Sequence, residues 1–240
     1  MKDSVISLAD PESVASLIDH TLLKPEASCA DIRRLCEEAA RYSFASVCVN
    51  PWNVAEAVDL LRGGKVRVCT VAGFPLGATL PRVKIEEAEE SLAQGAQEID
   101  MVINIGALKS AQHRAMEEDV RGVVEACHRR GAICKVILEC ALLTTDEKAA
   151  AARVARDLGA DFVKTSTGFG PGGATVEDVK LLRSVVGSEI GVKAAGGIRT
   201  FEDLKNMVRA GANRIGASAS VKILEEARAA RKSDDGLAPL

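Results

Sequence analysis

The chain has 240 residues, of which 47% are hydrophobic, 27% are charged and only 3% are aromatic, and its formal net charge is −3. This charge gives no reason to expect nucleic acid or an anionic membrane surface as a partner, and so few aromatic residues argue against base-stacking platforms. No apolar run approaches the roughly 18 residues of a membrane span, and the N-terminus lacks the apolar core of a signal peptide.

The seven cysteines are odd in number, scattered and without a C-x-x-C pair. This pattern argues against a disulfide framework or a zinc site and indicates a reducing compartment. We therefore expect a cytoplasmic protein.

Apolar strand segments follow a short helix that is expected at about residues 11–18. In chain order the strand candidates are LIDH (17–20), SVCVN (46–50), VRVCTVAG (66–73), EIDMVIN (98–104), AICKVILE (132–139), DFVKTS (161–166), IGVKAAG (190–196) and NRIGAS (213–218). Each is short, rich in β-branched residues and bounded by turn residues, as expected of strands in a buried sheet.

The same junction recurs between the later strands: a glycine ends a segment of helical period, and a strand begins almost at once. These glycines are Gly95, Gly131, Gly159, Gly187 and Gly211. Their intervals of 36, 28, 28 and 24 residues have the size of one βα unit. Glycine suits this place because a helix commonly ends with a residue at positive φ.

Helix starts agree with this periodicity. Pairs typical of capping boxes occur at Thr144–Glu147, Thr175–Asp178 and Thr200–Asp203. Eight strands alternating with helices predict a parallel sheet of the α/β class. Eight units in a chain of this length favour one (β/α)8 TIM-barrel domain over residues 1–240, with an open doubly wound sheet as the alternative. The polar tail from about residue 232 to 240 is expected to be loose.

Four charged side chains fall inside the predicted strands. Because strand side chains alternate between faces, Asp100, Lys135, Lys164 and Lys193 all point into the barrel, on four consecutive strands. Buried charges are costly unless they are paired or functional. The four therefore form either a salt-bridged plug or an active site, and their place toward the strand C-termini favours an active site.

Neighbouring lysines have a specific chemical use. An ordinary lysine has a pKa of about 10.4 and is protonated at neutral pH. A second ammonium about 4 Å away would add roughly 4 kcal/mol of repulsion at an effective dielectric constant of about 20. This is enough to bring one lysine of a pair near neutrality and free its lone pair. Two adjacent lysines with a carboxylate therefore predict imine formation on one lysine, with the other two groups moving protons.

Glycine-rich segments end the last three predicted strands, at residues 164–170, 193–199 and 216–218. Bare glycines let backbone N–H groups approach an anion, and helix N-termini add positive potential. In barrels the phosphate site commonly forms around strands 7 and 8. The sequence therefore predicts a phosphate site at this end of the barrel.

The motifs IDHTLLKP (18–25), SVCVNP (46–51), GFPLG (73–77), EID (98–100), KTSTG (164–168), KAAGG (193–197) and RIGAS (214–218) span nearly the whole chain. With them the sequence resembles the 2-deoxyribose-5-phosphate aldolase family, a family of class I lyases. The resemblance implies reversible cleavage of 2-deoxy-D-ribose 5-phosphate to D-glyceraldehyde 3-phosphate and acetaldehyde, in deoxyribonucleotide and carbohydrate breakdown. It implies a small sugar phosphate and an aldehyde as ligands, with no cofactor and no metal.

The resemblance also implies roles for individual residues. Lys164 would form the Schiff base, while Asp100 and Lys193 would relay protons. Asp19 and Thr167 would help to bind substrate hydroxyls, and Lys135 would support the charge network. The phosphate would be held by Gly168, Gly196, Gly197, Arg199, Gly216 and Ser218.

Two positions depart from the family pattern. Some members carry a lysine where this chain has Phe169, so that phosphate binding would rest on backbone groups and Arg199. Some members also end in a tyrosine that reaches the site, whereas Tyr42 is the only tyrosine of this chain.

Two other functions stay open on the residues alone. One is a barrel isomerase or epimerase of sugar phosphates that uses Asp100 as a base without a covalent step, and the other is a non-catalytic barrel that binds a phosphorylated ligand. The three histidines, His20, His113 and His128, are too dispersed to suggest a metal triad. A homo-oligomer is expected, with a dimer as the simplest form.

Overall fold

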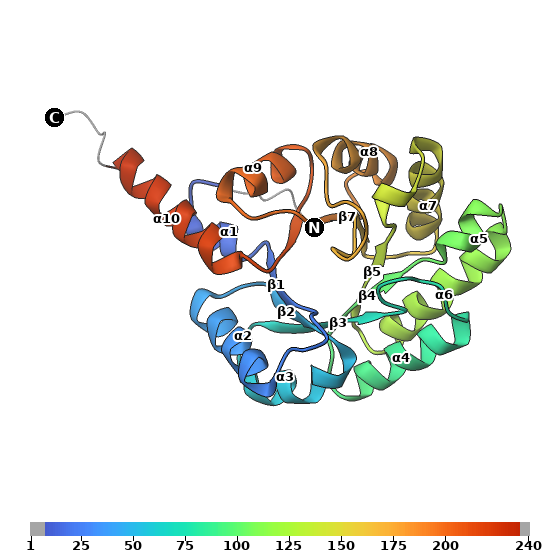
Figure 1. The fold of residues 1–240 in the computed structure, drawn as a ribbon, viewed down its shortest axis with the longest axis horizontal. Helices are drawn as coiled ribbons and strands as arrows, with labels where there is room; N and C mark the ends of the chain where they lie inside the picture. Colours follow the sequence, from blue (N-terminus) through green and yellow to red (C-terminus); the bar gives the residue numbers. More distant parts are fainter. Residues whose placement is uncertain (1–7, 236–240) are drawn as a thin grey trace.

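Eight parallel strands form a closed barrel in the order β1 to β8 (Figure 1), in a computed structural model that describes residues 8–235, with side chains through residue 232. The strands are β1 (Ile18–Leu22), β2 (Ser46–Val49), β3 (Arg67–Ala72), β4 (Glu98–Val102), β5 (Ile133–Ile137), β6 (Phe162–Lys164), β7 (Gly191–Ala195) and β8 (Arg214–Ala217). The pairing of β1 with β8 closes the sheet, so the predicted barrel is confirmed and the open sheet is excluded.

Helices surround the barrel and alternate with the strands (Figure 1). They are α1 (Pro11–Ala15), α2 (Cys29–Tyr42), α3 (Val54–Leu60), α4 (Pro81–Ala93), α5 (Ile105–Lys109), α6 (His113–Arg129), α7 (Thr145–Asp157), α8 (Val176–Val186), α9 (Phe201–Arg209) and α10 (Ser220–Asp235), with short 3₁₀ helices η1 (Pro51–Asn53) and η2 (Cys140–Leu142). His113 and His128 lie on α6 and are exposed.

Strand alternation separates an apolar layer from a charged interior. Ile99 and Met101 of β4 belong to the apolar core between strands and helices, and both are fully buried. Their neighbour Asp100 is also fully buried but contacts lysines of other strands. The period of two therefore places apolar side chains outside the barrel and ionic ones inside it, as predicted.

The helix boundaries follow the capping signals. Thr144 and Thr200 form complete capping boxes with Glu147 and Asp203. Thr175 accepts a hydrogen bond from the backbone N–H of Asp178 and caps α8 in that way. The five junction glycines all have positive φ, between 66° and 115°. A side chain there would be strained, so glycine sets where each strand can begin.

Two predicted boundaries are wrong. The first helix ends at Ala15 rather than about residue 18, because Ile18 already pairs with Ile215 in the sheet. Residues 232–235 belong to α10 instead of a loose tail, whereas 236–240 lie outside the described residues. Alanine, leucine, glutamate, lysine and arginine dominate α10 as a whole, so the helix propensity of α10 outweighs the polarity of its last residues.

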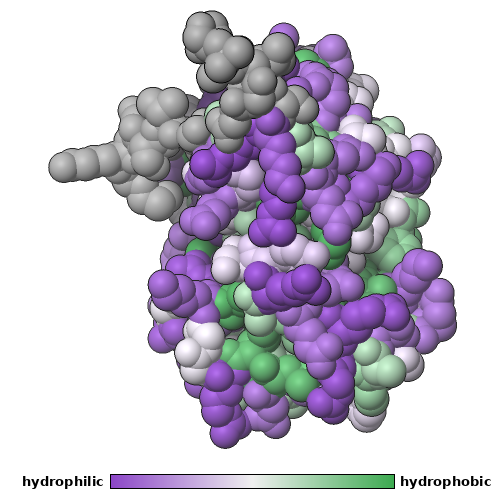
Figure 2. Space-filling model, turned by 90° about the vertical axis from the view of Figure 1, so that its left-hand side faces the viewer, coloured by the Kyte–Doolittle hydropathy of each residue, from purple (hydrophilic) through white to green (hydrophobic). Residues whose placement is uncertain are grey.

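The outer surface is mainly polar on the side that carries α10 and α2. Figure 2 shows this face covered largely by hydrophilic residues, with smaller hydrophobic areas between them. Among the described residues, no helix combines the length and apolar character needed to cross a bilayer.

Candidate active site

Three lysine side chains converge on the carboxylate of Asp100 inside the barrel. Asp100 on β4 lies beside Lys135 on β5, and Lys164 on β6 lies beside Lys193 on β7 in the strand register. Lys164 Nζ is 2.8 Å and Lys193 Nζ 2.7 Å from the same oxygen, Asp100 Oδ2. Lys135 Nζ is 2.7 Å from the other oxygen, Oδ1, which also accepts a hydrogen bond from Cys69 Sγ at 3.2 Å. The structure therefore brings together the four charged residues predicted from strand alternation.

A second set of ion pairs joins Lys193 and Lys135 of this cluster to further charged side chains. Asp19 Oδ2 is 2.5 Å from Lys193 Nζ, and Asp19 Oδ1 is 2.7 Å from Arg214 Nη1. Glu98 Oε2 is 2.6 Å from Lys135 Nζ and 3.2 Å from Arg214 Nη1. These contacts join β1, β4, β5, β7 and β8, so each charged group is held by groups on other strands.

Burial and pairing shift the pKa values of the cluster in opposite directions. Burial raises the pKa of Asp100, but Lys135, Lys164 and Lys193 outweigh burial and hold it well below the ordinary value. Burial lowers the pKa of Lys193, but Asp100 and Asp19 outweigh burial and raise it above the ordinary value. Lys193 thus rests as an ammonium and Asp100 as a carboxylate at neutral pH.

The charges of the cluster do not balance. Lys135, Lys164, Lys193 and Arg214 face the carboxylates of Asp19, Glu98 and Asp100. Asp100 contacts Lys135 and Lys193 as well as Lys164, and Glu98 also contacts Arg67 at 3.3 Å. Lys164 is therefore not needed to pair any buried carboxylate, and an unpaired buried carboxylate would be costly. Asp100 lies between Lys164 and Lys193 as a shared anion, so the two ammonium groups are not left to repel each other alone.

Lys164 also lines a cavity of about 350 Å³ at the C-terminal ends of the strands. The lining comprises Thr21, Leu22, Leu23, Lys24, Lys164, Thr167, Gly168, Phe169, Ala195, Gly196, Gly197, Ile198, Arg199, Gly216, Ala217 and Ser218. Asp100, Lys135 and Lys193 are absent from this lining and are fully buried. A ligand in the cavity therefore reaches the amine of Lys164, and the other charged groups act from behind it.

All six predicted phosphate-binding residues line the same cavity. Gly168, Gly196 and Gly197 have φ between 81° and 87°, a conformation that favours glycine. Ser218 lies two residues before the start of α10, where helix N–H groups add positive potential. Arg199 is exposed at the edge. This end of the cavity thus offers backbone donors and the cation of Arg199 to an anion.

Asp19 occupies a different position from the one expected. It is fully buried, is held by Lys193 and Arg214, and does not line the cavity. This position does not fit the expected contact with a substrate hydroxyl. Strand alternation gives the direction of a side chain but not its depth along the barrel axis. Asp19 points into the barrel, but it contacts Lys193 and Arg214 and not the cavity.

Thr167 does line the cavity, and its side chain is held by a residue that the sequence left without a role. Glu139 Oε2 accepts hydrogen bonds from the backbone N–H of Thr167 at 3.1 Å and from its hydroxyl. Glu139 follows β5 with φ of 56° and ψ of 63°. A non-glycine residue in this left-handed region costs on the order of 1–3 kcal/mol and persists where its surroundings hold it.

Arg214 is the main residue that sequence reasoning missed. It alternates with Gly216 along β8, so the same period of two that located the lysines would have placed it inside the barrel. Gly216 gives the neighbouring lysine room, because a Cβ at this position would lie 3.1 Å from Lys193 Cε.

Two groups in the described part of the chain have possible metal-ligating atoms within 4.8 Å of one another: Cys48, Cys69 and Asp100, and Asp19, Cys69 and Glu98. Their carboxylates already contact lysine or arginine, which would repel a divalent cation. His20 is bonded to Glu38 at 2.8 Å and to Ser220 at 3.0 Å and lies apart from these groups. The donor sets thus suit ion pairs better than a metal ion.

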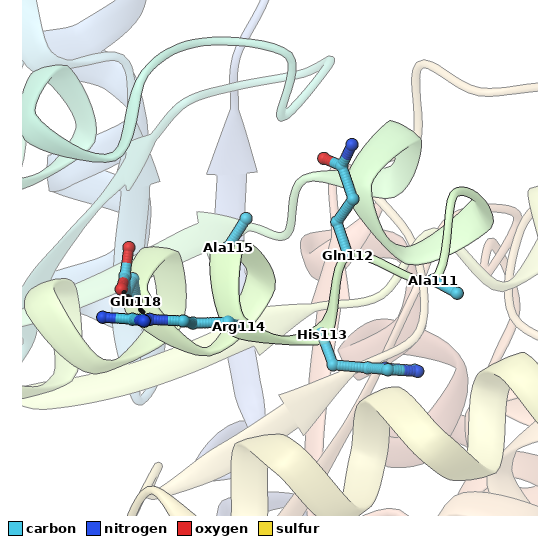
Figure 3. A pocket seen from close by; sticks show the side chains of 6 residues that line it. All are labelled: Ala111, Gln112, His113, Arg114, Ala115 and Glu118. Atoms are coloured by element: carbon cyan, nitrogen blue, oxygen red, sulfur yellow. Dashed lines mark hydrogen bonds and ion pairs between the residues drawn. The ribbon is translucent and has the colours of Figure 1, made fainter.

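Another hollow, of about 650 Å³, lies at the junction of α5 and α6 (Figure 3). Its lining comes from one segment, residues 111–118, and includes an ion pair between Arg114 and Glu118 at 2.9 Å. The labelled side chains point in different directions in Figure 3 and do not converge on a common point. This hollow therefore lacks the arrangement of an active site.

A family model described as DeoC/LacD family aldolase matches residues 13–230. The chain belongs to the DeoC/LacD aldolase family. Membership confirms the resemblance drawn from the sequence motifs.

Individual relatives of this aldolase agree. The chain is 55% identical over 216 residues to a deoxyribose-phosphate aldolase of Clostridium perfringens (strain 13 / Type A), covering 90% of this chain and 96% of the relative. It is 56% identical over 216 residues to a deoxyribose-phosphate aldolase of Thermococcus kodakarensis, covering 89% and 96%.

Solved structures give the same picture. The deoxyribose phosphate aldolase of Aeropyrum pernix matches with a TM-score of 0.86 and 38% identity, over 92% of this chain and 93% of that chain. An N-acetylmannosamine-6-phosphate 2-epimerase of Clostridium perfringens, 18% identical with a TM-score of 0.61, shares only the fold.

The ion-pair cluster predicts a pH-dependent effect of Asp19→Asn on stability. We expect the free energy of unfolding at pH 7 to fall by about 3–5 kcal/mol, since Lys193 and Arg214 lose a buried partner. The folded-state pKa of Asp19 is lowered because Lys193, Arg214 and Lys135 outweigh its burial. The stability that Asp19 provides is therefore present above its unfolded pKa of about 4 and is lost as pH falls below it.

Urea unfolding of the wild type and the variant at pH 7 and at about pH 3 measures this effect. The difference between the two proteins should shrink at the lower pH. Asp59→Asn is the control, because Asp59 forms an exposed pair with Arg62 and its loss should change stability little at either pH. A difference for Asp19→Asn that stays the same at both pH values would contradict the prediction.

Proposed function

We propose that this protein is a metal-independent deoxyribose-phosphate aldolase that cleaves 2-deoxy-D-ribose 5-phosphate through a Schiff base on Lys164. One observation carries the proposal: the amine of Lys164 lines a cavity and shares one oxygen of Asp100 with Lys193. The names of relatives more than 50% identical over nine-tenths of the chain support the same reaction.

The proposed reaction begins with attack of Lys164 Nζ on the C1 aldehyde of the open-chain sugar. Loss of water from the carbinolamine gives a protonated imine. A base then removes the proton of the C3 hydroxyl, the C2–C3 bond breaks, and its electron pair moves into the imine to form an enamine. D-glyceraldehyde 3-phosphate leaves, a proton adds to C2 of the enamine, and water hydrolyses the imine to release acetaldehyde and the free amine.

The cluster suits this sequence because the protonated imine carries the same single positive charge as the ammonium it replaces. Asp100 Oδ2, at 2.8 Å, is the acceptor nearest to a proton leaving Lys164. Lys193 contacts the same oxygen and can pass a proton to it or take one from it. We therefore assign proton transfer to Asp100 and Lys193, and maintenance of their charge to Lys135 and Asp19.

We place the 5-phosphate at the glycine-rich end of the cavity, against Gly168, Gly196, Gly197, Gly216 and Ser218. Arg199 would supply a positive side chain there, since Phe169 stands where some family members carry lysine. Three positive-φ glycines, the start of α10 and a cationic side chain at one end of the cavity support this placement.

We further propose that the protein is a cytoplasmic homodimer. The cysteines are free thiols, in keeping with a reducing compartment. Trp52 is 92% exposed and Leu76 74% exposed, and large apolar side chains left in water favour self-association. The Aeropyrum pernix relative has a tetrameric structure, so a larger assembly is the alternative that sedimentation would reveal.

Imine trapping tests the role of Lys164. With acetaldehyde and borohydride, we expect the wild type to retain an ethyl group on Lys164, located by peptide mass mapping. Lys164→Ala should lose the adduct and lower kcat for deoxyribose 5-phosphate by at least about 1000-fold with the fold intact, because of the two lysines in the cavity lining, Lys24 and Lys164, it is Lys164 that contacts Asp100. Lys180→Ala, which removes an exposed lysine of α8, is the control and should behave as wild type.

The possible results separate the candidate functions. Normal turnover by Lys164→Ala would overturn the imine mechanism. An unmodified Lys164 in a protein that isomerises or epimerises sugar phosphates would support a reaction without a covalent step. A folded protein that turns over no sugar phosphate would leave a phosphate-binding barrel as the remaining function.

Arg199→Ala tests the phosphate site. We expect KM for deoxyribose 5-phosphate to rise about 10-fold, the effect of losing one charge-assisted hydrogen bond, and kcat to change little. Unphosphorylated deoxyribose should be cleaved equally by wild type and variant. Steady-state kinetics with both substrates measures this, and Arg33→Ala on the exposed face of α2 is the control. An equal loss with both substrates would place Arg199 outside the phosphate site.

A further inference from the structure

Glu139 combines burial with a strained backbone next to the substrate cavity. It is 2% exposed, and its φ of 56° lies in the left-handed region. Non-glycine residues in this conformation cluster at active sites and ligand clamps. The proposed reaction leaves Glu139 without a role, and its contacts indicate one.

The carboxylate of Glu139 fixes the direction of one hydroxyl proton. Glu139 Oε2 accepts a hydrogen bond from Thr167 Oγ1, and a carboxylate can only accept. The backbone N–H of Phe169 donates to the same Thr167 oxygen at 3.0 Å. The Thr167 hydroxyl thus donates its proton to Glu139 and uses one lone pair to accept from Phe169. Toward the cavity it can only accept a hydrogen bond.

The other oxygen of Glu139 is a second acceptor. Glu139 Oε1 is buried and has no hydrogen-bond partner among the described residues. Glu139 lines a small cavity of about 70 Å³ that shares Thr167 and Phe169 with the cavity of Lys164. Gly170 covers the carboxylate closely, because a Cβ there would lie 2.9 Å from Glu139 Cδ. An unpaired buried acceptor is unfavourable until a donor reaches it.

These observations lead to one inference, which rests on the proposed function. We propose that Glu139 is a positioning residue that holds the Thr167 hydroxyl as a hydrogen-bond acceptor and thereby selects substrates with a hydroxyl between the reacting carbon and the phosphate. In the sequence, Thr167 stands between Lys164, which would hold C1, and Gly168 of the phosphate site. The hydroxyl facing it is then the one on C4 of the sugar.

After cleavage, the C4 hydroxyl of the sugar is the C2 hydroxyl of D-glyceraldehyde 3-phosphate. In the reverse reaction, aldol addition, this aldehyde is the acceptor of the new carbon–carbon bond. Removal of the hydroxyl leaves the aldehyde and the phosphate intact, so the carbon–carbon bond can still form. An aldehyde without this hydroxyl would leave the remaining lone pair of Thr167 Oγ1 without a donor in the complex. Sites built around a substrate hydroxyl reject analogues that lack it for this reason.

The experiment measures aldol addition of acetaldehyde to two acceptors, D-glyceraldehyde 3-phosphate and 3-phosphopropanal, which lacks the C2 hydroxyl. We expect the wild type to prefer the hydroxylated acceptor by about 10- to 100-fold in kcat/KM. Glu139→Gln should lower this preference at least about 5-fold, because an amide can also donate and no longer fixes the Thr167 proton. The loss should fall on the hydroxylated acceptor, with 3-phosphopropanal almost unaffected.

Two further variants separate positioning from folding. Glu139→Gly removes the carboxylate and suits the positive φ, so it should show the same loss of preference even if Glu139→Gln is unstable. Glu177→Gln, an exposed glutamate of α8, is the matched control and should keep the wild-type ratio. An equal fall with both acceptors in the Glu139 variants would reduce Glu139 to a structural residue and overturn the inference.

The failure of this inference can be told apart from failure of the proposed function. A wild type that forms the Lys164 adduct and uses both acceptors equally would keep the aldolase and overturn the selection by Glu139. A wild type that forms no adduct and joins neither acceptor would overturn the aldolase and, with it, this inference.

Discussion

The fully buried carboxylate of Asp100 is the group on which the interior of this barrel depends. Lys135, Lys164 and Lys193 all reach it within 2.8 Å, so its removal would leave three cations facing one another without water. Buried charges of one sign are tolerated only when carboxylates separate them. Asp19 and Glu98 extend the pairing to Arg214, and the whole set holds six side chains besides Asp100 at fixed places. The amine of Lys164 is thereby held in one orientation before any ligand arrives.

The barrel makes this arrangement possible because alternate residues of adjacent strands face a common interior. Lys164 and Lys193 are direct neighbours in the sheet, as are Asp100 and Lys135. Small residues keep the space open: Gly216 leaves room for Lys193, and Gly191 leaves room for the ring of Phe162, which a Cβ would approach to 2.1 Å. The fold therefore contributes both the charges and the gaps that let long side chains extend toward the centre.

The period of two and the junction glycines made the barrel, its eight strands and the inward lysines predictable from the sequence. Alternation does not predict how deep a side chain lies along the barrel axis or which backbone conformation a residue adopts. Asp19 was expected at the substrate, yet it does not line the cavity and is paired with Lys193, because direction alone does not say how far along the axis a side chain lies. Arg214 could have been found by the same alternation. Alternation also puts Glu139 on the inward face with Lys135, but it does not predict the left-handed backbone or the contact with Thr167.

The site thus separates three physical tasks along the barrel axis and around its mouth. Ion pairs behind Lys164 hold the buried charges together, and glycine N–H groups at the mouth offer only donors, as an anion requires. Next to Gly168, Glu139 turns Thr167 into an acceptor. A ligand that carries a carbonyl, a hydroxyl donor and an anion in that order matches all three regions at once. Because the two regions at the mouth act on different functional groups, losing either should weaken one specific contact and leave the chemistry at Lys164 intact.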